Sequence, residues 1–208
     1  SRRAIYCQPA SSRTSAVFCQ RDGLCLGEHV AGSIDAFVDM MNAKAKELGA
    51  LNTHFANASG LYNTNHYTTA YDMAMIARGC YNNASFVSID STADAYVIPA
   101  TNMSAQRTIR HRHKMLKGRA YYYEYCKGGK TGYTDESQNT LVTFAEKDGM
   151  RLICVVFKEA TDEIRYVDTR TFLTGDLPIS RNQQQPEASS EQCSPMTTIT
   201  TRLFSQLF

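Results

Sequence analysis

The sequence predicts an α+β domain in which helices pack around an antiparallel sheet. Two segments with apolar residues at helical spacing, at residues 34–48 and 69–80, predict the helices. Two β-rich runs, at residues 140–145 and 150–157, flank Lys147-Asp148-Gly149. An Asp-Gly pair between such runs predicts a hairpin. The second run is almost entirely apolar, which indicates a central strand that is buried on both faces.

Both helices carry start or stop signals. Ser33 is the expected N-cap of the first helix, and Gly49 follows its last apolar residue as a stop. The second helix opens with Thr69-Ala70-Tyr71-Asp72, which is similar to a capping box. These signals agree with the apolar periodicity, so the sequence predicts both elements from independent features.

The composition excludes several classes of function. The 208 residues include 22 basic and 20 acidic ones, and this balance gives no reason to expect a nucleic-acid or membrane-surface partner. No apolar run is long enough for a membrane-spanning helix. Seven cysteines, an odd number without a Cys-x-x-Cys pair, argue against a disulfide scaffold and a zinc site. We therefore expect no metal and no cofactor.

Two short motifs are excluded, one as a metal site and the other as a phosphate-binding loop. The basic run Arg110-His111-Arg112-His113-Lys114 contains His-x-His, but no acidic or cysteine partner lies at ligand spacing. We expect it to be a solvated loop or a strand edge. Gly129-Lys130-Thr131 is similar to the end of a phosphate-binding loop, but Glu124 stands where that loop needs its first glycine.

Lys130-Thr131-Gly132 is the motif with the clearest chemistry. A lysine at the start of such a motif supplies a cation for a substrate carboxylate, and the threonine hydroxyl adds a hydrogen bond. The glycine leaves room for an extended substrate to lie against the strand as an added β-strand. By itself the motif also fits an ordinary surface strand.

Several blocks of sequence that contain or flank this motif share their order with a known protein family. They lie at residues 27–42, 52–55, 65–74, 128–134 and 149–153. Together they closely resemble the low-molecular-mass penicillin-binding proteins, the serine-type D-Ala-D-Ala carboxypeptidases, over residues 27–173. The resemblance implies an α/β sandwich of the β-lactamase and DD-peptidase type, here incomplete. It also implies removal of the terminal D-alanine from peptidoglycan stem peptides through an acyl-serine intermediate.

The resemblance also implies a role for each site residue. Lys130, Thr131 and Gly132 belong to the catalytic cleft, with Lys130 and Thr131 contacting the substrate carboxylate. Thr134 occupies a matching position on the same strand, and Arg165 matches an arginine that helps to hold the terminal carboxylate. The alternative for Arg165 is an ordinary surface position on a helix. The implied partners are stem peptides ending in D-Ala-D-Ala and β-lactam antibiotics.

The chain departs from the family pattern at its nucleophile. No Ser-x-x-Lys occurs in the sequence, so we expect the chain as it stands to lack turnover. The Ser-x-Asn motif is missing from its expected place near residues 18–20, and the matches at Ser137-Gln138-Asn139 and Ser180-Arg181-Asn182 follow Lys130. Two alternative functions remain open, a class A-like β-lactamase and a non-catalytic peptidoglycan-binding remnant.

The two ends differ from the middle of the chain. Residues 1–26 and 174–208 are rich in Ser, Arg, Gln and Thr without sustained periodicity, and the second is expected to be a disordered tail. In shifted reading frames, codons for residues 18–22 can encode Ser-Ala-Asn-Glu, and those for 173–181 Asp-Trp-Gly-Phe-Ala-Asn-Phe-Gln. We interpret both ends as frame-shifted, which sequencing the encoding DNA tests.

Family members are exported to the cell wall, and many have a membrane anchor. We expect neither that anchor nor a signal peptide in residues 1–208: a signal peptide either was removed or belongs to a missing N-terminus.

Overall fold

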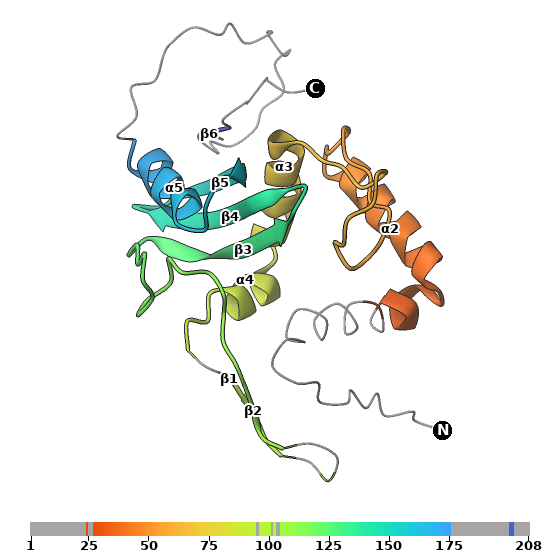
Figure 1. Cartoon of the computed structure of the whole chain (residues 1–208), viewed down its shortest axis with the longest axis horizontal. Coiled ribbons are helices and arrows are strands. Elements are labelled where there is room, and N and C mark those ends of the chain that lie inside the picture. The colour runs from red at the N-terminus through yellow and green to blue at the C-terminus, as the bar shows by residue number, and fades with distance from the viewer. Residues whose placement is uncertain are drawn as a thin grey trace, which may run out of the picture. The chain divides into compact units, whose positions relative to one another are not determined.

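The computed structural model describes Leu24 and residues 27–94, 96–100, 102, 105–175 and 200–201 (Figure 1). The chain forms two compact units: the first contains Ser1–Gly79 and Thr92–His111, and the second contains Cys80–Ser91 and Arg112–Phe208. The predicted frame-shifted ends, 1–26 and 174–208, lie outside the described residues except for a few positions. None of the helices within the described part is long and apolar enough to cross a membrane.

The first unit contains helix α2 (Ile34–Glu47), most of helix α3 (Ala70–Tyr81) and a small antiparallel pair, β1 (Tyr96–Ile98) and β2 (Arg107–Ile109). Both helices confirm the sequence-based prediction. The Ser33 hydroxyl accepts a hydrogen bond from the Ala36 N–H at 3.1 Å, as expected of an N-cap. Gly49 has φ +88°, a backbone conformation that suits glycine just after a helix.

Asp72 departs from the expected capping box. Its own N–H donates to the Thr69 hydroxyl at 3.1 Å, so half of the box is present. Its carboxylate instead accepts hydrogen bonds from the Asn52 N–H at 2.5 Å and the Thr53 hydroxyl at 2.9 Å. Asp72 is 1% exposed. The carboxylate therefore binds the segment at Asn52 and Thr53 to α3, in addition to the hydrogen bond at the start of the helix.

Replacing Asp72 with alanine is expected to lower the free energy of unfolding by about 3 kcal/mol, because it leaves the buried Thr53 hydroxyl and the part-buried Asn52 N–H without a charged acceptor. Asp35→Ala is a matched control, since Asp35 is an exposed acid in the first turn of α2. Its expected cost is about 0.5 kcal/mol. Urea denaturation followed by circular dichroism measures both. Equal losses in the two variants would show that Asp72 acts only through the helix dipole.

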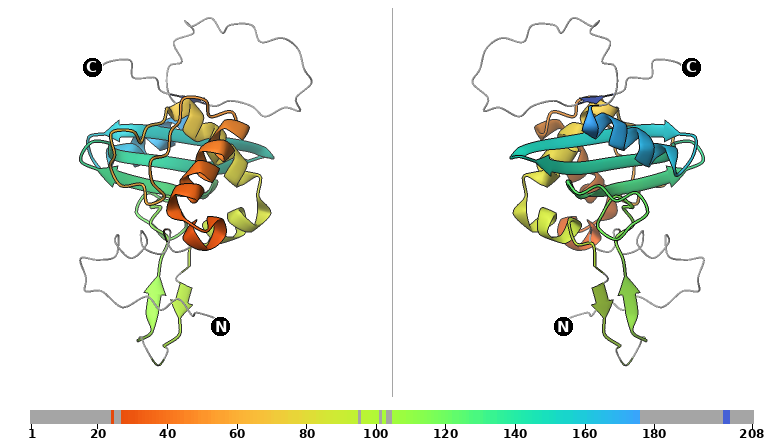
Figure 2. Two further views of the ribbon diagram at one scale, coloured as in Figure 1. Left: turned by 90° about the vertical axis from the view of Figure 1, so that its right-hand side faces the viewer. Right: turned by 90° about the vertical axis from the view of Figure 1, so that its left-hand side faces the viewer.

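The second unit contains helix α4 (Ala84–Asp90), strands β3 (Cys126–Thr134), β4 (Gln138–Lys147) and β5 (Met150–Glu159), helix α5 (Ile164–Thr174) and the short strand β6 (Thr200–Thr201). The sheet has the order β3-β4-β5-β6, and its first three strands are antiparallel. Helix α5 covers one face of this sheet (Figure 2). The α+β class is confirmed.

The predicted hairpin joins β4 to β5. Lys147 pairs with Met150, and Asp148 and Gly149 have φ +52° and +77°. Two positive φ values characterise the tight turn that Asp-Gly favours. Four consecutive β5 residues, from Ile153 to Val156, are buried. This confirms that the apolar run is a strand covered on both faces.

The core of the second unit contains His113, which the sequence-based interpretation placed in a solvated loop or strand edge. That interpretation was wrong for His113, whose exposed fraction is 0%. Its Nε2 lies 2.9 Å from the hydroxyl of Thr143, itself a buried β4 residue. A polar partner inside the core allows the imidazole to be buried. The flanking Arg112 is exposed, as expected.

Candidate functional site

Strand β3 carries Lys130, Thr131 and Gly132 along one edge of the sheet. It pairs with β4, and no other strand among the described residues pairs with its outer side. The Gly129 N–H donates to the Asp90 carboxylate at the end of α4, at 2.7 Å, and so points away from β4. Because backbone groups alternate along an antiparallel strand, the N–H groups of Thr131 and Tyr133 point to the same outer side. This edge can therefore accept an extended peptide.

Gly129 allows β3 to approach β4 just before the motif. Its φ is +141°, and a Cβ at this position would lie 2.0 Å from the Val142 carbonyl oxygen. Only glycine fits this combination of backbone angle and close contact. Lys130 then pairs with Val142 itself, so the register of the motif depends directly on this contact.

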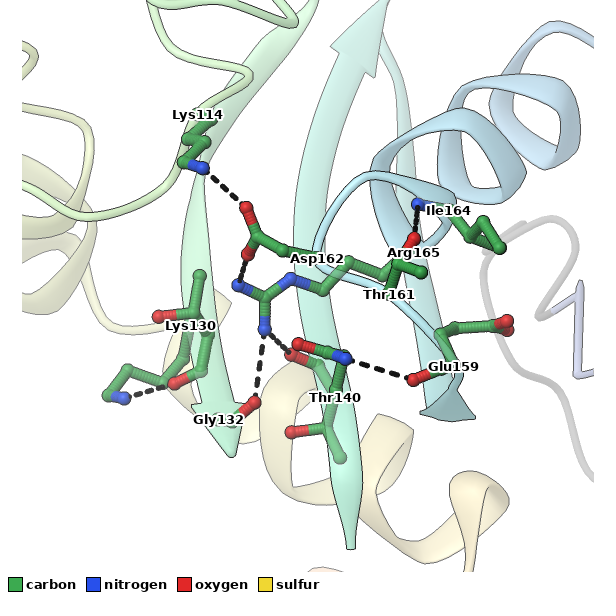
Figure 3. Close-up of polar contacts among 11 residues, drawn as sticks. Lys114, Lys130, Gly132, Thr140, Glu159, Thr161, Asp162, Ile164 and Arg165 are labelled. Carbon is green, nitrogen blue, oxygen red and sulfur yellow. Dashed lines mark hydrogen bonds and ion pairs between the residues drawn. The ribbon is translucent and has the colours of Figure 1, made fainter. Parts of the chain in front are cut away.

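The Lys130 side chain is exposed, and its ammonium group donates to the Thr131 carbonyl oxygen (Figure 3). Gly132 pairs with Thr140 on β4, and a Cβ on Gly132 would lie 2.4 Å from the Thr140 hydroxyl. Side chains alternate along the strand, so Lys130 and Gly132 share one face. The absence of a side chain at Gly132 makes room for the Thr140 hydroxyl on that face.

Thr134 ends β3, where its hydroxyl takes part in the turn to β4. It donates to the Ser137 hydroxyl at 3.0 Å and accepts from the Ser137 N–H, also at 3.0 Å. The Ser-x-Asn match at Ser137 thus belongs to a turn, in keeping with its interpretation as a chance match. Contact between Thr134 and substrate stays a prediction.

Arg165 lies on α5 and reaches the same part of the sheet. Its Nη1 donates to the carbonyl oxygens of Gly132 and Thr140, each at 3.0 Å (Figure 3). Its Nη2 donates to the Asp162 carboxylate. Arg165 is 7% exposed, so the alternative of a surface helix position is wrong. Arg165 thus contacts Gly132 and Thr140, a residue pair across β3 and β4. Contact between Arg165 and a substrate carboxylate stays a prediction.

Three residues at this site were missed by sequence reasoning. Asp90 bonds the edge of β3, whereas Asp162 and Lys114 form an ion pair beside Arg165. Asp90 and Lys114 lie 39 and 48 residues from their partners in the chain, whereas Asp162 lies three residues before Arg165. Among the residues that the structure describes, no group of three His, Cys, Asp or Glu side chains is arranged to hold a metal ion.

Comparisons with known proteins identify the family of this chain. The family model for D-alanyl-D-alanine carboxypeptidase, peptidase S11, matches residues 21–161. The D-alanyl-D-alanine carboxypeptidase DacF of Bacillus subtilis is 34% identical over 163 residues, which cover 78% of this chain and 40% of the relative. The chain thus spans less than half the length of this curated relative.

Solved structures show the same fold. A D-alanyl-D-alanine carboxypeptidase from Mycobacterium tuberculosis is 28% identical, with a TM-score of 0.61 over 76% of this chain and 60% of that one. Penicillin-binding protein D2 from Listeria monocytogenes, in its cefotaxime-bound form, is 25% identical, with a TM-score of 0.59 over 73% and 58%. The chain therefore belongs to the D-alanyl-D-alanine carboxypeptidase family, peptidase S11.

Proposed function

We propose that the chain provides the substrate-binding part of a serine-type D-Ala-D-Ala carboxypeptidase, which removes the terminal D-alanine of peptidoglycan stem peptides through an acyl-serine intermediate. The outer edge of β3 carries this proposal, because exposed Lys130 lies between outward-facing backbone groups. A stem peptide lying along this edge pairs with Thr131 and Tyr133 as an added strand. Its terminal carboxylate then meets the Lys130 ammonium group.

The other site residues support this binding mode. The Thr131 hydroxyl donates to the substrate carboxylate, and Gly132 leaves space for the terminal residue. Thr134 holds the end of the strand and contributes a polar group to the same edge. Arg165 adds positive charge behind the Gly132 rung, which favours a bound anion. Since the sequence has no Ser-x-x-Lys, this polypeptide by itself is expected to bind the peptide without turnover.

The partners follow from the same chemistry. β-Lactam antibiotics carry a carboxylate next to a strained amide, so they present the same groups to Lys130 and to the strand. The cefotaxime-bound Listeria protein supports β-lactams as ligands of this site. The family acts at the cell wall outside the cytoplasm, and we propose that location for this chain. Non-catalytic peptidoglycan binding is the second candidate, favoured by the missing Ser-x-x-Lys. Covalent labelling of the chain by a fluorescent penicillin would exclude it and would also contradict the expected lack of turnover.

A titration of the ¹⁵N-labelled chain with diacetyl-L-Lys-D-Ala-D-Ala tests the proposal. We expect the amide resonances of Thr131 and Tyr133 to shift with added peptide. The same peptide with a C-terminal amide should bind at least about tenfold more weakly, because it lacks the charged acceptor for Lys130. A peptide ending in L-Ala-L-Ala is the stereochemical control. Equal affinity for all three peptides would contradict the proposal.

A further inference from the structure

Asp162 joins two cations from different parts of the second unit. It lies in the turn between β5 and α5, and its Oδ1 accepts a hydrogen bond from Arg165 Nη2. Its Oδ2 accepts one from Lys114 Nζ, in the segment that precedes β3 (Figure 3). One carboxylate thus connects the start of α5 with a segment 48 residues away in the chain.

The second half of the Arg165 guanidinium contacts the strand pair behind the proposed site. Nη1 donates to the carbonyl oxygens of Gly132 and Thr140, each at 3.0 Å, and these two residues are partners across β3 and β4. The Arg165 side chain is 8% exposed, whereas that of Asp162 is 44% exposed. A cation this buried needs a negative partner, and Asp162 supplies it.

An aromatic pair lies next to both cations. The Tyr166 ring is buried, with Arg165 Cζ 5.2 Å and Lys114 Nζ 5.9 Å from its centroid. Tyr121 stacks on Tyr166 with 4.8 Å between centroids. These rings limit the movement of both cations, so the position of Arg165 along α5 is set by Asp162 on one side and the two carbonyl groups on the other.

We propose that Asp162 is a positioning residue: it holds the Arg165 guanidinium against the Gly132–Thr140 rung and thereby fixes the strand segment that binds the substrate carboxylate. The effect of Asp162 on peptide binding rests on the proposed function, whereas its effect on the position of Arg165 does not. Asp162 itself acts through Arg165 and contacts no substrate. Lys114 in turn fixes the rotamer of Asp162 by occupying its second oxygen.

The ionisation of Asp162 agrees with this role. Burial opposes ionisation, but the hydrogen bond from Lys114 and the charge of Arg165 outweigh it, so the pKa of Asp162 is below its ordinary value. Lys114 and Arg165 are the charged groups that face it, and the Tyr166 and Tyr121 hydroxyls are the nearby titratable ones. A lowered pKa means that the interaction is complete above the unfolded value of about 3.9 and is lost as pH falls through the folded value.

The test compares Asp162→Asn, Asp162→Glu and Glu163→Gln in the full chain. Glu163→Gln is a matched control, because it removes one negative charge at the same helix end, where Glu163 makes no capping hydrogen bond. In Asp162→Asn we expect the Gly132 and Thr140 carbonyl ¹³C resonances to move and the Arg165 Nη hydrogens to exchange faster. Affinity for diacetyl-L-Lys-D-Ala-D-Ala should fall about tenfold. Asp162→Glu should keep the carbonyl resonances, the hydrogen-exchange rate and the peptide affinity close to the wild-type values. Glu163→Gln should leave these three quantities unchanged.

The wild-type chain should show the same carbonyl shifts as Asp162→Asn only when the pH falls through the folded pKa of Asp162, which lies below the unfolded value of about 3.9. Lys114→Met provides a milder second variant if Asp162→Asn does not fold, and intermediate carbonyl shifts are expected. Unchanged Gly132 and Thr140 resonances in Asp162→Asn, or equal changes in Glu163→Gln, would overturn the inference. If the wild type does not bind the peptide, the proposed function fails, while the carbonyl resonances still decide whether Asp162 positions Arg165.

Discussion

Gly129→Ala is expected to lower the free energy of unfolding by about 4 kcal/mol or more, because two costs coincide. The new Cβ would lie 2.0 Å from the Val142 carbonyl oxygen, which is backbone and has no rotamer to change. The native φ of +141° is also a conformation that alanine strongly avoids. Since Lys130 pairs with Val142, β3 would have to separate from β4 at the start of the motif.

Gly118→Ala separates these two costs. Gly118 also has a positive φ, at +75°, but nothing lies within 4 Å of its added Cβ. Its expected cost is therefore only the conformational one, about 1 kcal/mol. Thermal and urea denaturation of the two variants and the wild type provide the comparison. A Gly129→Ala protein as stable as Gly118→Ala would mean that β3 and β4 are not packed as closely as the structure shows.

Lys130→Met is expected to weaken binding of diacetyl-L-Lys-D-Ala-D-Ala by about 10- to 100-fold, since a hydrogen bond between charged groups contributes about 1.5–3 kcal/mol. The preference for the acid over the C-terminal amide should disappear in this variant, because the group that senses the charge is gone. Stability should change little, since Lys130 is exposed. Isothermal titration with both peptides measures the effect.

Lys127→Met is the control for this prediction. Lys127 is an exposed lysine on the same strand, so its replacement makes the same change in net charge and side-chain shape. We expect it to retain most of the affinity and all of the preference for the acid. If the two variants lose affinity equally, the peptide responds to the overall charge of the strand, and a specific role for Lys130 is wrong.

Elements with local signals could be predicted from the sequence. The N-cap at Ser33, the stop at Gly49 and the Asp148-Gly149 turn depend on residues within a few positions of one another. The buried β5 run follows equally from its continuous apolar composition. Because these signals need no knowledge of tertiary contacts, the α+β class followed from them.

The features that failed or were missed depend on partners far along the chain. His113 is buried because Thr143, 30 residues later, supplies its hydrogen bond. Arg165 is buried because its donors reach carbonyl oxygens 25 and 33 residues earlier. Asp90 bonds a backbone N–H 39 residues away. A basic run or a lone acidic residue carries no local sign of such partners, so sequence reasoning assigned solvent positions or overlooked them.

The candidate site also combines residues that a local motif identifies with residues whose partners are distant in the chain. The resemblance to the carboxypeptidases identified Lys130, Thr131 and Gly132 from a contiguous motif, and the structure places these residues on the edge strand. The resemblance also identified Arg165, but its ion-pair partner Asp162, and Lys114 beside it, had no assigned role. The close approach of Gly129 to the Val142 carbonyl oxygen likewise has no local signal in the sequence.

The binding edge of β3 can be observed directly by intermolecular nuclear Overhauser effects in the ¹⁵N-labelled chain with excess diacetyl-L-Lys-D-Ala-D-Ala. We expect contacts from the two D-alanine methyl groups to the amides of Thr131 and Tyr133, because these N–H groups face outward on the strand. The terminal methyl should lie on the side of Lys130. Contacts confined to other segments, with none to Thr131 or Tyr133, would contradict the assignment of β3 as the substrate-binding strand.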